Sequence, residues 1–242
     1  MRMQRTAAGV TLAMLALAAP GAQAAQMREY RALAISAGGE RIAAVEAVDP
    51  GVPGQRAHGR VVVRDAASGR IVSEYDPCAT CSYDFPSFSP DRSALAFIAS
   101  DARGGVATLW VARGGKTVPV GAVKGVANTA RWSPDGASIA VLATVGATKQ
   151  TGAVEAGARL VGEIGSSEDA QRIAVVPVAG GTLRLVSPAD TYVYEYDWTP
   201  DGRGFVATSA GVMATTTGGS RRSATSTRAA ARCASSRRRR CR

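Results

Sequence analysis

The 242-residue sequence is poor in the residue types on which most active sites depend. It holds one histidine, His58, and aromatic residues make up 5% of the chain. No Gly-x-Ser-x-Gly segment occurs, so the sequence offers no nucleophile elbow of the kind found in α/β-hydrolases. His58 lies in the loop 51–59, where a solvated side chain is the simplest expectation and a metal or acid–base role is the alternative. We therefore expect no catalytic residues, no cofactor and no catalysis by these residues alone.

The sequence also lacks an apolar run of the roughly 20 residues that a membrane-spanning helix needs. Its longest such run covers residues 7–19, follows Arg2 and Arg5, and ends at Pro20 and Gly21. The small-x-small segment 22–24 then suits a signal peptidase. These features favour a secretory signal peptide over residues 1–24, with a membrane anchor as the alternative. We expect a periplasmic or secreted protein with no membrane span once the signal is removed.

Acidic residues are absent from the C-terminal segment, where nine arginines fall within residues 211–242. The formal charge of +10 therefore belongs to the two ends of the chain, and the residues between them are close to neutral. A neutral body gives no electrostatic footprint for phosphate, so we expect no nucleic acid to bind it. Residues 213–242 suggest a disordered basic tail. Another interpretation is that this tail binds nucleic acid or anionic membrane.

A lost reading frame would also explain the tail. If each new codon takes its first base from the preceding third position, the stretch 213–222 can encode Gly-Asp-Asn-Asn-Trp-Trp-Val-Ala-Lys. That segment, unlike the arginine-rich one, has the loop and strand character of the preceding chain. The sequence therefore predicts that residues 213–242 are frameshifted and disordered.

Cysteines number four, and two of them, Cys233 and Cys241, lie in the tail. The other two form the C-x-x-C pair Cys78 and Cys81. In an exported chain a structural disulfide is the first expectation. A redox motif would need a thioredoxin-like setting, which is missing, and zinc would need a second pair of ligands. Free or partly oxidised thiols are the remaining alternative.

A repeated turn is the main feature of the body. The segments 88–92, 132–136 and 198–202 read Phe-Ser-Pro-Asp-Arg, Trp-Ser-Pro-Asp-Gly and Trp-Thr-Pro-Asp-Gly, and a short apolar run follows each one. Proline presets the second position of a turn, aspartate accepts backbone hydrogen bonds and glycine supplies a positive φ. Each segment thus predicts a β-hairpin built on Ser89, Pro90 and Asp91, on Ser133, Pro134 and Asp135, and on Thr199, Pro200 and Asp201.

Further strands complete each unit. After the first hairpin come strands at 107–112 and 116–120, separated by a Gly-Gly turn, and after the second come strands at 172–178 and 182–186. An earlier degraded unit begins at 30–36, with Ala-Gly-Gly in place of Pro-Asp-Gly. Four strands per repeat and a spacing of 44 residues between Pro90 and Pro134 are typical of propeller blades. A β-sandwich with similar hairpins is the alternative.

The predicted fold class is therefore all-β, an incomplete β-propeller of about three and a half four-stranded blades over residues 25–212. The segment 146–171 is read as a long loop between strands. Its acids Glu163, Glu168 and Asp169 could bind calcium, yet their spacing fits no known calcium loop, so a solvated loop is expected and no metal site is predicted.

Aromatic residues alternate at period two in one segment, at Tyr192, Tyr194, Tyr196 and Trp198. Alternation in a strand would place all four side chains on one face. Packing between neighbouring blades is the simpler interpretation of this stripe. The alternative is an aromatic platform that contacts a peptide.

The three hairpin segments, together with the Gly-Gly turn before a Leu-Arg-Leu-Val strand at 183–186, resemble the N-terminal propeller of prolyl oligopeptidase-family serine peptidases. More distantly they resemble TolB-like periplasmic propellers, and the resemblance covers residues 28–210. The peptidase family implies a propeller that gates access to a C-terminal α/β-hydrolase domain with a Ser-Asp-His triad. No residue here matches that triad. The expected function is a non-catalytic, substrate-gating fragment of a secreted peptidase, and the alternative is a TolB-like protein-binding scaffold.

Overall fold

A computed structural model describes residues 27–48, 57–101, 103–147 and 170–211. The predicted signal peptide (1–24), the tail (213–242), and Glu163, Glu168 and Asp169 lie outside these ranges. Within them the chain forms thirteen strands and no helix. The strands are β1 (Arg28–Ile35), β2 (Arg41–Val48), β3 (Arg60–Asp65), β4 (Ile71–Tyr75), β5 (Ser82–Phe88), β6 (Ala94–Asp101), β7 (Val106–Arg113), β8 (Lys116–Trp132), β9 (Ser138–Val145), β10 (Arg172–Pro177), β11 (Arg184–Leu185), β12 (Thr191–Trp198) and β13 (Phe205–Gly211).

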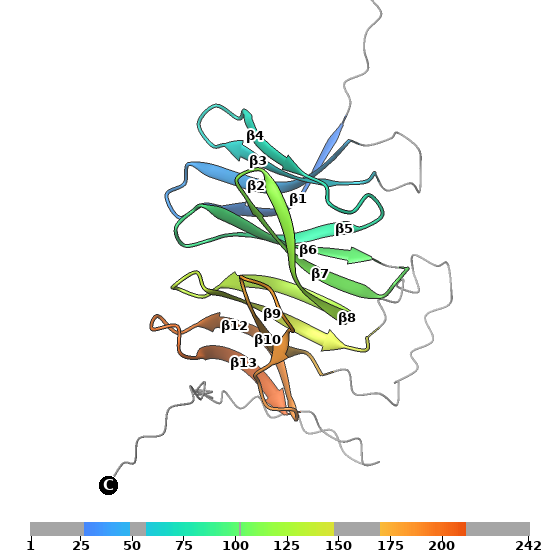
Figure 1. The fold of residues 1–242 in the computed structure, drawn as a ribbon, viewed down its shortest axis with the longest axis vertical. Helices are drawn as coiled ribbons and strands as arrows, with labels where there is room; N and C mark the ends of the chain where they lie inside the picture. Colours follow the sequence, from blue (N-terminus) through green and yellow to red (C-terminus); the bar gives the residue numbers. More distant parts are fainter. Residues whose placement is uncertain (1–26, 49–56, 102, 148–169, 212–242) are drawn as a thin grey trace, which may run out of the picture.

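All pairings between these strands are antiparallel. Strands β1 to β4 form one four-stranded sheet, β5 to β11 form a seven-stranded sheet, and β12 pairs with β13. In Figure 1 these layers follow one another along the long axis of the molecule, in chain order. No helix in the described part of the chain is long and apolar enough to cross a membrane.

Strand β8 joins two four-stranded units that the sequence predicted as separate. Its first half, as far as Lys124, pairs with β7, and its second half, from Gly125, pairs with β9. Gly125 marks the transition with a φ of 135°, and a Cβ at this position would lie 2.2 Å from the carbonyl oxygen of Thr144. Only glycine permits that approach, so the chain passes from one unit to the next without a loop.

We call β1 to β4 the first unit, β5 to Lys124 the second, Gly125 to β11 the third and β12 to β13 the fourth. Apolar side chains fill the space between consecutive units. Alternation along β6 sends Phe97 toward the first unit and Ile98 toward the third. Because both faces of β6 are covered, its apolar run is nearly continuous rather than alternating with polar residues. The third and fourth units meet around Leu142 and Tyr196.

This all-β arrangement of successive antiparallel sheets is consistent with a β-propeller-like fold. Four-stranded units packed face to face in chain order are what the repeated turns predicted. The fourth unit contributes two strands within the described residues. The first strand of each unit precedes the turn of that unit. These four strands carry the residues of the candidate site, and they are β1, β5, the second half of β8, and β12.

Candidate functional site

The three predicted hairpins have one hydrogen-bonding pattern. In each, the hydroxyl of the first residue bonds to Oδ1 of the aspartate two positions later, at 2.5 Å, in the pairs Ser89–Asp91, Ser133–Asp135 and Thr199–Asp201. The same hydroxyl accepts a bond from the N–H five positions later, at 2.9–3.0 Å. Bonds from the hydroxyls of Ser89 and Ser93 lower the pKa of Asp91 to about 2.

Consecutive turns also touch one another. A Cβ on Gly136 would lie 3.9 Å from Cδ of Pro90, and one on Gly202 would lie 3.5 Å from Cδ of Pro134. Pro90, Pro134 and Pro200 therefore occupy the same position in three turns that lie side by side. The turns form a continuous border at one end of the units.

The degraded first turn keeps the backbone pattern without the aspartate. Ser36 bonds through its backbone N–H to the carbonyl of Arg41, and its hydroxyl accepts the N–H of Arg41 at 3.0 Å. Gly38 stands where the other turns have aspartate. An ideal Cβ on Gly38 would lie 2.2 Å from Oε1 of Glu40, so the Glu40 carboxylate fills the space of the missing side chain.

A bulge interrupts the first strand of every unit. On β1 the register slips between Arg31 and Ala34, on β5 between Asp84 and Ser87, and on β8 between Asn128 and Arg131. Each slip adds one residue to the first strand. Bulges of this kind bend a strand and redirect its side chains.

Three of these bulges hold a residue other than glycine in the left-handed region. Ala32 has a φ of 50°, and Phe85 and Thr129 each have a φ of 52°. Each lies four positions before the hydroxyl residue of its turn. This conformation costs a residue with a side chain about 1–3 kcal/mol, and a β-branched residue such as Thr129 is least suited to it. Strain repeated at one position in three units points to a functional constraint.

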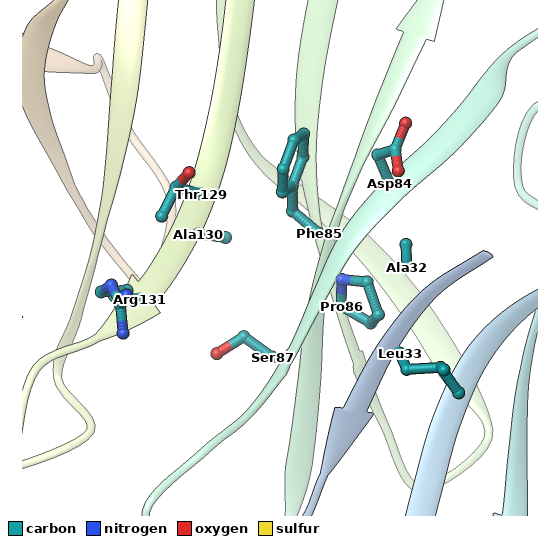
Figure 2. A pocket seen from close by; sticks show the side chains of 9 residues that line it. All are labelled: Ala32, Leu33, Asp84, Phe85, Pro86, Ser87, Thr129, Ala130 and Arg131. Carbon is teal, nitrogen blue, oxygen red and sulfur yellow. The ribbon is translucent and has the colours of Figure 1, made fainter. Parts of the chain in front are cut away.

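The three strained bulges line one hollow of about 410 Å³. Figure 2 shows the ring of Phe85 between Thr129 on one side and Asp84 on the other, with Arg131 and Ser87 below them. Nine residues line the hollow, from three first strands: Ala32, Leu33, Asp84, Phe85, Pro86, Ser87, Thr129, Ala130 and Arg131.

Aromatic side chains of the following unit hold the bulges in place. The hydroxyl of Tyr196 donates to the carbonyl of Thr129 at 2.6 Å, and the indole N–H of Trp198 donates to the carbonyl of Arg131 at 3.1 Å. One unit earlier, the indole N–H of Trp132 donates to the carbonyl of Ser87 at 2.8 Å. The hollow therefore has a preorganised wall.

The hollow offers both charges and an apolar ring. The guanidinium of Arg131 lies 3.6 Å from the carboxylate of Asp197 and 5.9 Å from the centre of the Tyr196 ring. The carboxylate of Asp84 and the partly exposed ring of Phe85 face the same space. Such a set can bind an extended peptide through its charges, amides and apolar side chains. The hollow contains no histidine, and the described residues contain no group of three potential metal ligands.

The predicted aromatic stripe is interrupted. The register of β12 slips between Val193 and Glu195, so that Val193 and Tyr196 point inward, with exposed fractions of 1% and 3%. Tyr194 is 57% exposed and points away. The prediction that Tyr192, Tyr194, Tyr196 and Trp198 share one face is therefore wrong, because it assumed an unbroken period of two. The rings of Tyr192 and Tyr194 remain in contact, with their centres 5.0 Å apart.

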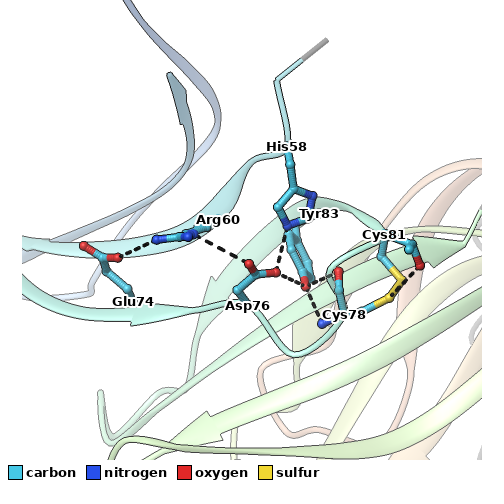
Figure 3. Close-up of polar contacts among 8 residues, drawn as sticks. His58, Arg60, Glu74, Asp76, Cys78, Cys81 and Tyr83 are labelled. Carbon is cyan, nitrogen blue, oxygen red and sulfur yellow. Dashed lines mark hydrogen bonds and ion pairs between the residues drawn. A yellow bond between two sulfur atoms is a disulfide. The ribbon is translucent and has the colours of Figure 1, made fainter. Parts of the chain in front are cut away.

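Cys78 and Cys81 form a disulfide at the base of a polar cluster before β5. The hydroxyl of Tyr83 lies 2.7 Å from the N–H and 2.8 Å from the carbonyl of Cys78, and 2.9 Å from Oδ1 of Asp76. Figure 3 shows His58 and Tyr83 together on one side of the same carboxylate, with Arg60 on the other side. The Nε2 of His58 lies 2.8 Å from Oδ1 of Asp76. His58 is exposed, as expected of a solvated loop side chain, and Asp76 also holds its ring against Tyr83.

Sequence reasoning missed the bulges and the hollow. Ala32, Phe85 and Thr129 are ordinary strand residues in composition, and no glycine marks their positive φ. Their constant distance from the turn was visible, but it has meaning only once the register slips are known.

No protein-family model matches the chain, and no curated protein matches it in sequence. Among solved structures, it is similar to TolB from Acinetobacter baumannii, with 14% identity and a TM-score of 0.46, over 75% of this chain and 37% of that one. It is similar to Pyrococcus horikoshii acylaminoacyl peptidase, with 12% identity and a TM-score of 0.48, over 75% and 28%. It is also similar to oligogalacturonate lyase from Vibrio parahaemolyticus, with 12% identity and a TM-score of 0.49, over 75% of this chain and 46% of that one. The chain thus spans less than half of each of these proteins, two of which are named for different activities.

Proposed function

We propose that the chain is the non-catalytic part of a secreted serine peptidase, an incomplete propeller of about three and a half blades that contacts peptides and gates their access. One observation carries this proposal: three strained bulges from three successive units converge on a single hollow. Backbone strain is retained where a site needs its groups in fixed positions. The resemblance of the three turns to peptidase propellers supports the same proposal.

The composition of the hollow fits a short peptide with free ends. Asp84 suits a terminal ammonium, Arg131 suits a terminal carboxylate, and Phe85 offers an apolar surface between them. Arginine pairs with carboxylates through two parallel hydrogen bonds, which fixes their orientation. The chemistry of bond cleavage would have to come from residues outside this chain, since its one histidine, His58, lies in the cluster beside Tyr83.

The test is calorimetric titration of the full chain with the tetrapeptide Ala-Phe-Ala-Ala. We expect saturable binding without release of new amino groups. Phe85→Ala introduces the residue that the first unit carries at the equivalent left-handed position, Ala32, so the bulge is expected to persist. It should weaken binding about tenfold, as expected for the loss of a buried aromatic contact worth about 1.4 kcal/mol. The matched control is Tyr30→Ala, an exposed aromatic on β1 outside the hollow. Absence of binding, or equal loss in both variants, would refute the proposal.

A stand-alone, TolB-like scaffold that binds proteins is the second candidate function. The observation in its favour is the contact between Tyr192 and the exposed Tyr194 on β12, on a sheet that also exposes Val206 of β13. Tyrosines that are partly apolar and partly polar are common at protein interfaces. A photo-crosslinking amino acid at position 194 should then give protein adducts. The peptidase proposal instead predicts peptide adducts from position 85.

We further propose that the chain is exported to the periplasm or beyond. The charged and apolar pattern of residues 1–24 and the Cys78–Cys81 disulfide both favour an oxidising compartment. N-terminal sequencing of the protein from its native source is expected to begin at Ala25. A mature chain that begins at Met1 would contradict export.

A further inference from the structure

A second, smaller cleft lies between the first and second units, on the side of the turns. Its volume is about 220 Å³, which is below the roughly 300–1,000 Å³ of pockets for drug-sized ligands. Its floor is apolar, with Val63, Phe88 and Leu95 among its lining residues. Three arginines, Arg41, Arg92 and Arg113, stand on its walls, together with two serines and the turn Gly114–Gly115.

The repeat shows that the fold does not require these arginines. Arg41, Ala94 and Ser138 take the same place in successive turns, since each accepts the N–H of the first turn residue through its carbonyl. Arg113 lies opposite Ala94 on the neighbouring strand, as Pro177 lies opposite Ser138. The corresponding positions between the second and third units are thus Ala94, Gly136 and Pro177, none of them charged.

Arg92 departs furthest from the repeat. It has a φ of 62°, where the next two turns have Gly136 at 69° and Gly202 at 67°. A left-handed arginine is strained where glycine would not be. Its guanidinium lies 2.7 Å from the carboxylate of Glu40 in the first turn, which fixes it at the mouth of the cleft.

The other two arginines form no ion pair of this kind, although the charge of Arg113 acts on the carboxylate of Asp91. Within the described ranges, no carboxylate lies within ion-pair distance of Arg41 or Arg113. Arg113 also lies directly opposite Lys116 across the Gly114–Gly115 turn. Like charges that face each other across two strands repel, and a bound anion would relieve this repulsion.

We propose that this cleft binds a small anion with an apolar body, its phosphate or carboxylate held by Arg41 and Arg113 and its apolar part on the floor of Val63, Phe88 and Leu95. Arginine forks match the oxygens of either head group. The two acids nearby are already engaged, Glu40 with Arg92 and Asp91 with Ser89 and Ser93. The site lies at the side of the units and is separate from the hollow of the first strands.

The probe is phenyl phosphate, and the readout is residue-resolved modification of arginines by phenylglyoxal in the full chain, followed by peptide mapping. We expect phenyl phosphate to slow the modification of Arg41 and Arg113 about tenfold, because a hydrogen bond to a charged group is worth about that factor. Arg184, an exposed arginine of the third unit outside the cleft, should react at an unchanged rate. Inorganic phosphate should protect less, and phenol not at all.

Two variants give the decisive comparison. Arg113→Gln should abolish the protection of Arg41, whereas the matched Arg184→Gln should leave it intact. If Arg113→Gln does not fold, Arg92→Gly keeps the proposal testable, because it introduces the glycine that the next two turns carry at this position. Arg92→Gly should reduce the protection of Arg41. Protection of Arg41 that survives both cleft variants, or equal protection of Arg184, would overturn the site. Equal protection by inorganic phosphate would overturn the apolar part of the ligand.

Discussion

The indole N–H of Trp132, in the third unit, donates a 2.8 Å hydrogen bond to the carbonyl of Ser87, in the second. Trp198 makes the equivalent bond to Arg131 one unit later, at 3.1 Å and at a more exposed position. The aromatic residue before each turn thus ties its own unit to the preceding one. Phe88 occupies the same place in the second unit. Its side chain has no hydrogen-bond donor, so only packing links the second unit to the first at this position.

The first prediction concerns this tie. Trp132→Phe leaves an aromatic ring, as at Phe88, but leaves the partly buried carbonyl of Ser87 without this donor. We expect a loss of about 1 kcal/mol in the free energy of unfolding, the usual value of a hydrogen bond, as measured by urea denaturation. Trp198→Phe should cost less because its bond is longer and solvent-exposed. A larger loss in Trp198→Phe would contradict this order.

The interrupted stripe gives the second prediction. Tyr196 is buried and its hydroxyl bonds to Thr129, so Tyr196→Phe should lower the free energy of unfolding by about 1 kcal/mol. Tyr194→Phe, two residues earlier, should change it by less than about 0.5 kcal/mol, as for most surface substitutions. Thermal or urea unfolding of both variants decides between this arrangement and an unbroken strand, which would make the two variants behave alike.

The turns were the part of this molecule that sequence reasoning described best, for a physical reason. Proline, aspartate and glycine act on the backbone within a few residues, so Ser133, Pro134 and Asp135 specify their turn locally. The strands of the second and third units follow from the same local patterns. The bulge at Thr129 depends instead on which residue of β9 it opposes, a relation between distant segments that composition does not encode.

The cluster before β5 was missed for a related reason. His58 and Asp76 are separated by 18 positions, and only the pairing of β3 with β4 brings their segments together. The arginines of the smaller cleft, between the first and second units, were visible in the sequence as departures from a repeat. Their convergence was not visible, since Arg41 and Arg113 belong to different units.

The third prediction tests the strain of the bulges. Ala32 is left-handed on β1, and Ala34, two residues later, pairs with Ala43 beyond the bulge. Ala32→Gly should raise the free energy of unfolding by about 0.5–1 kcal/mol, because glycine adopts this φ without penalty. Ala34→Gly should lower it by a similar amount, through the greater freedom of the unfolded chain. If both variants are destabilised, the left-handed conformation of Ala32 is not strained.

The fourth prediction concerns the disulfide. Cys78 and Cys81 close a loop of four residues, for which the entropy of loop closure gives a stabilisation of about 2 kcal/mol or less. The double variant Cys78→Ser with Cys81→Ser should therefore fold and lose no more than this in urea unfolding. A reductant should lower the stability of the wild type and leave that of the variant unchanged. Failure of the variant to fold would show that the disulfide does more than close its loop.

The last prediction follows from Asp76. Burial alone would raise the pKa of this carboxyl, but hydrogen bonds from His58 and Tyr83 and the nearby charge of Arg60 hold the pKa below its usual value. The folded protein therefore binds this proton less readily than the unfolded chain, whose aspartates have a pKa of about 3.9. Stability from this carboxylate is fully present above that value and is lost as the pH falls through the lower, folded pKa.

Asp76→Asn removes this dependence while keeping an acceptor for Tyr83. At pH 7 we expect it to cost about 1–3 kcal/mol, the range for a hydrogen-bonded charged group. The difference between wild type and variant should shrink as the pH falls from about 5 to 3, since the wild type becomes protonated and the variant cannot. Urea unfolding at each pH measures this difference in the free energy of unfolding, with Asp190→Asn as a control at an exposed loop position. A difference that stays constant over this interval would mean that Asp76 is not held ionised by its neighbours.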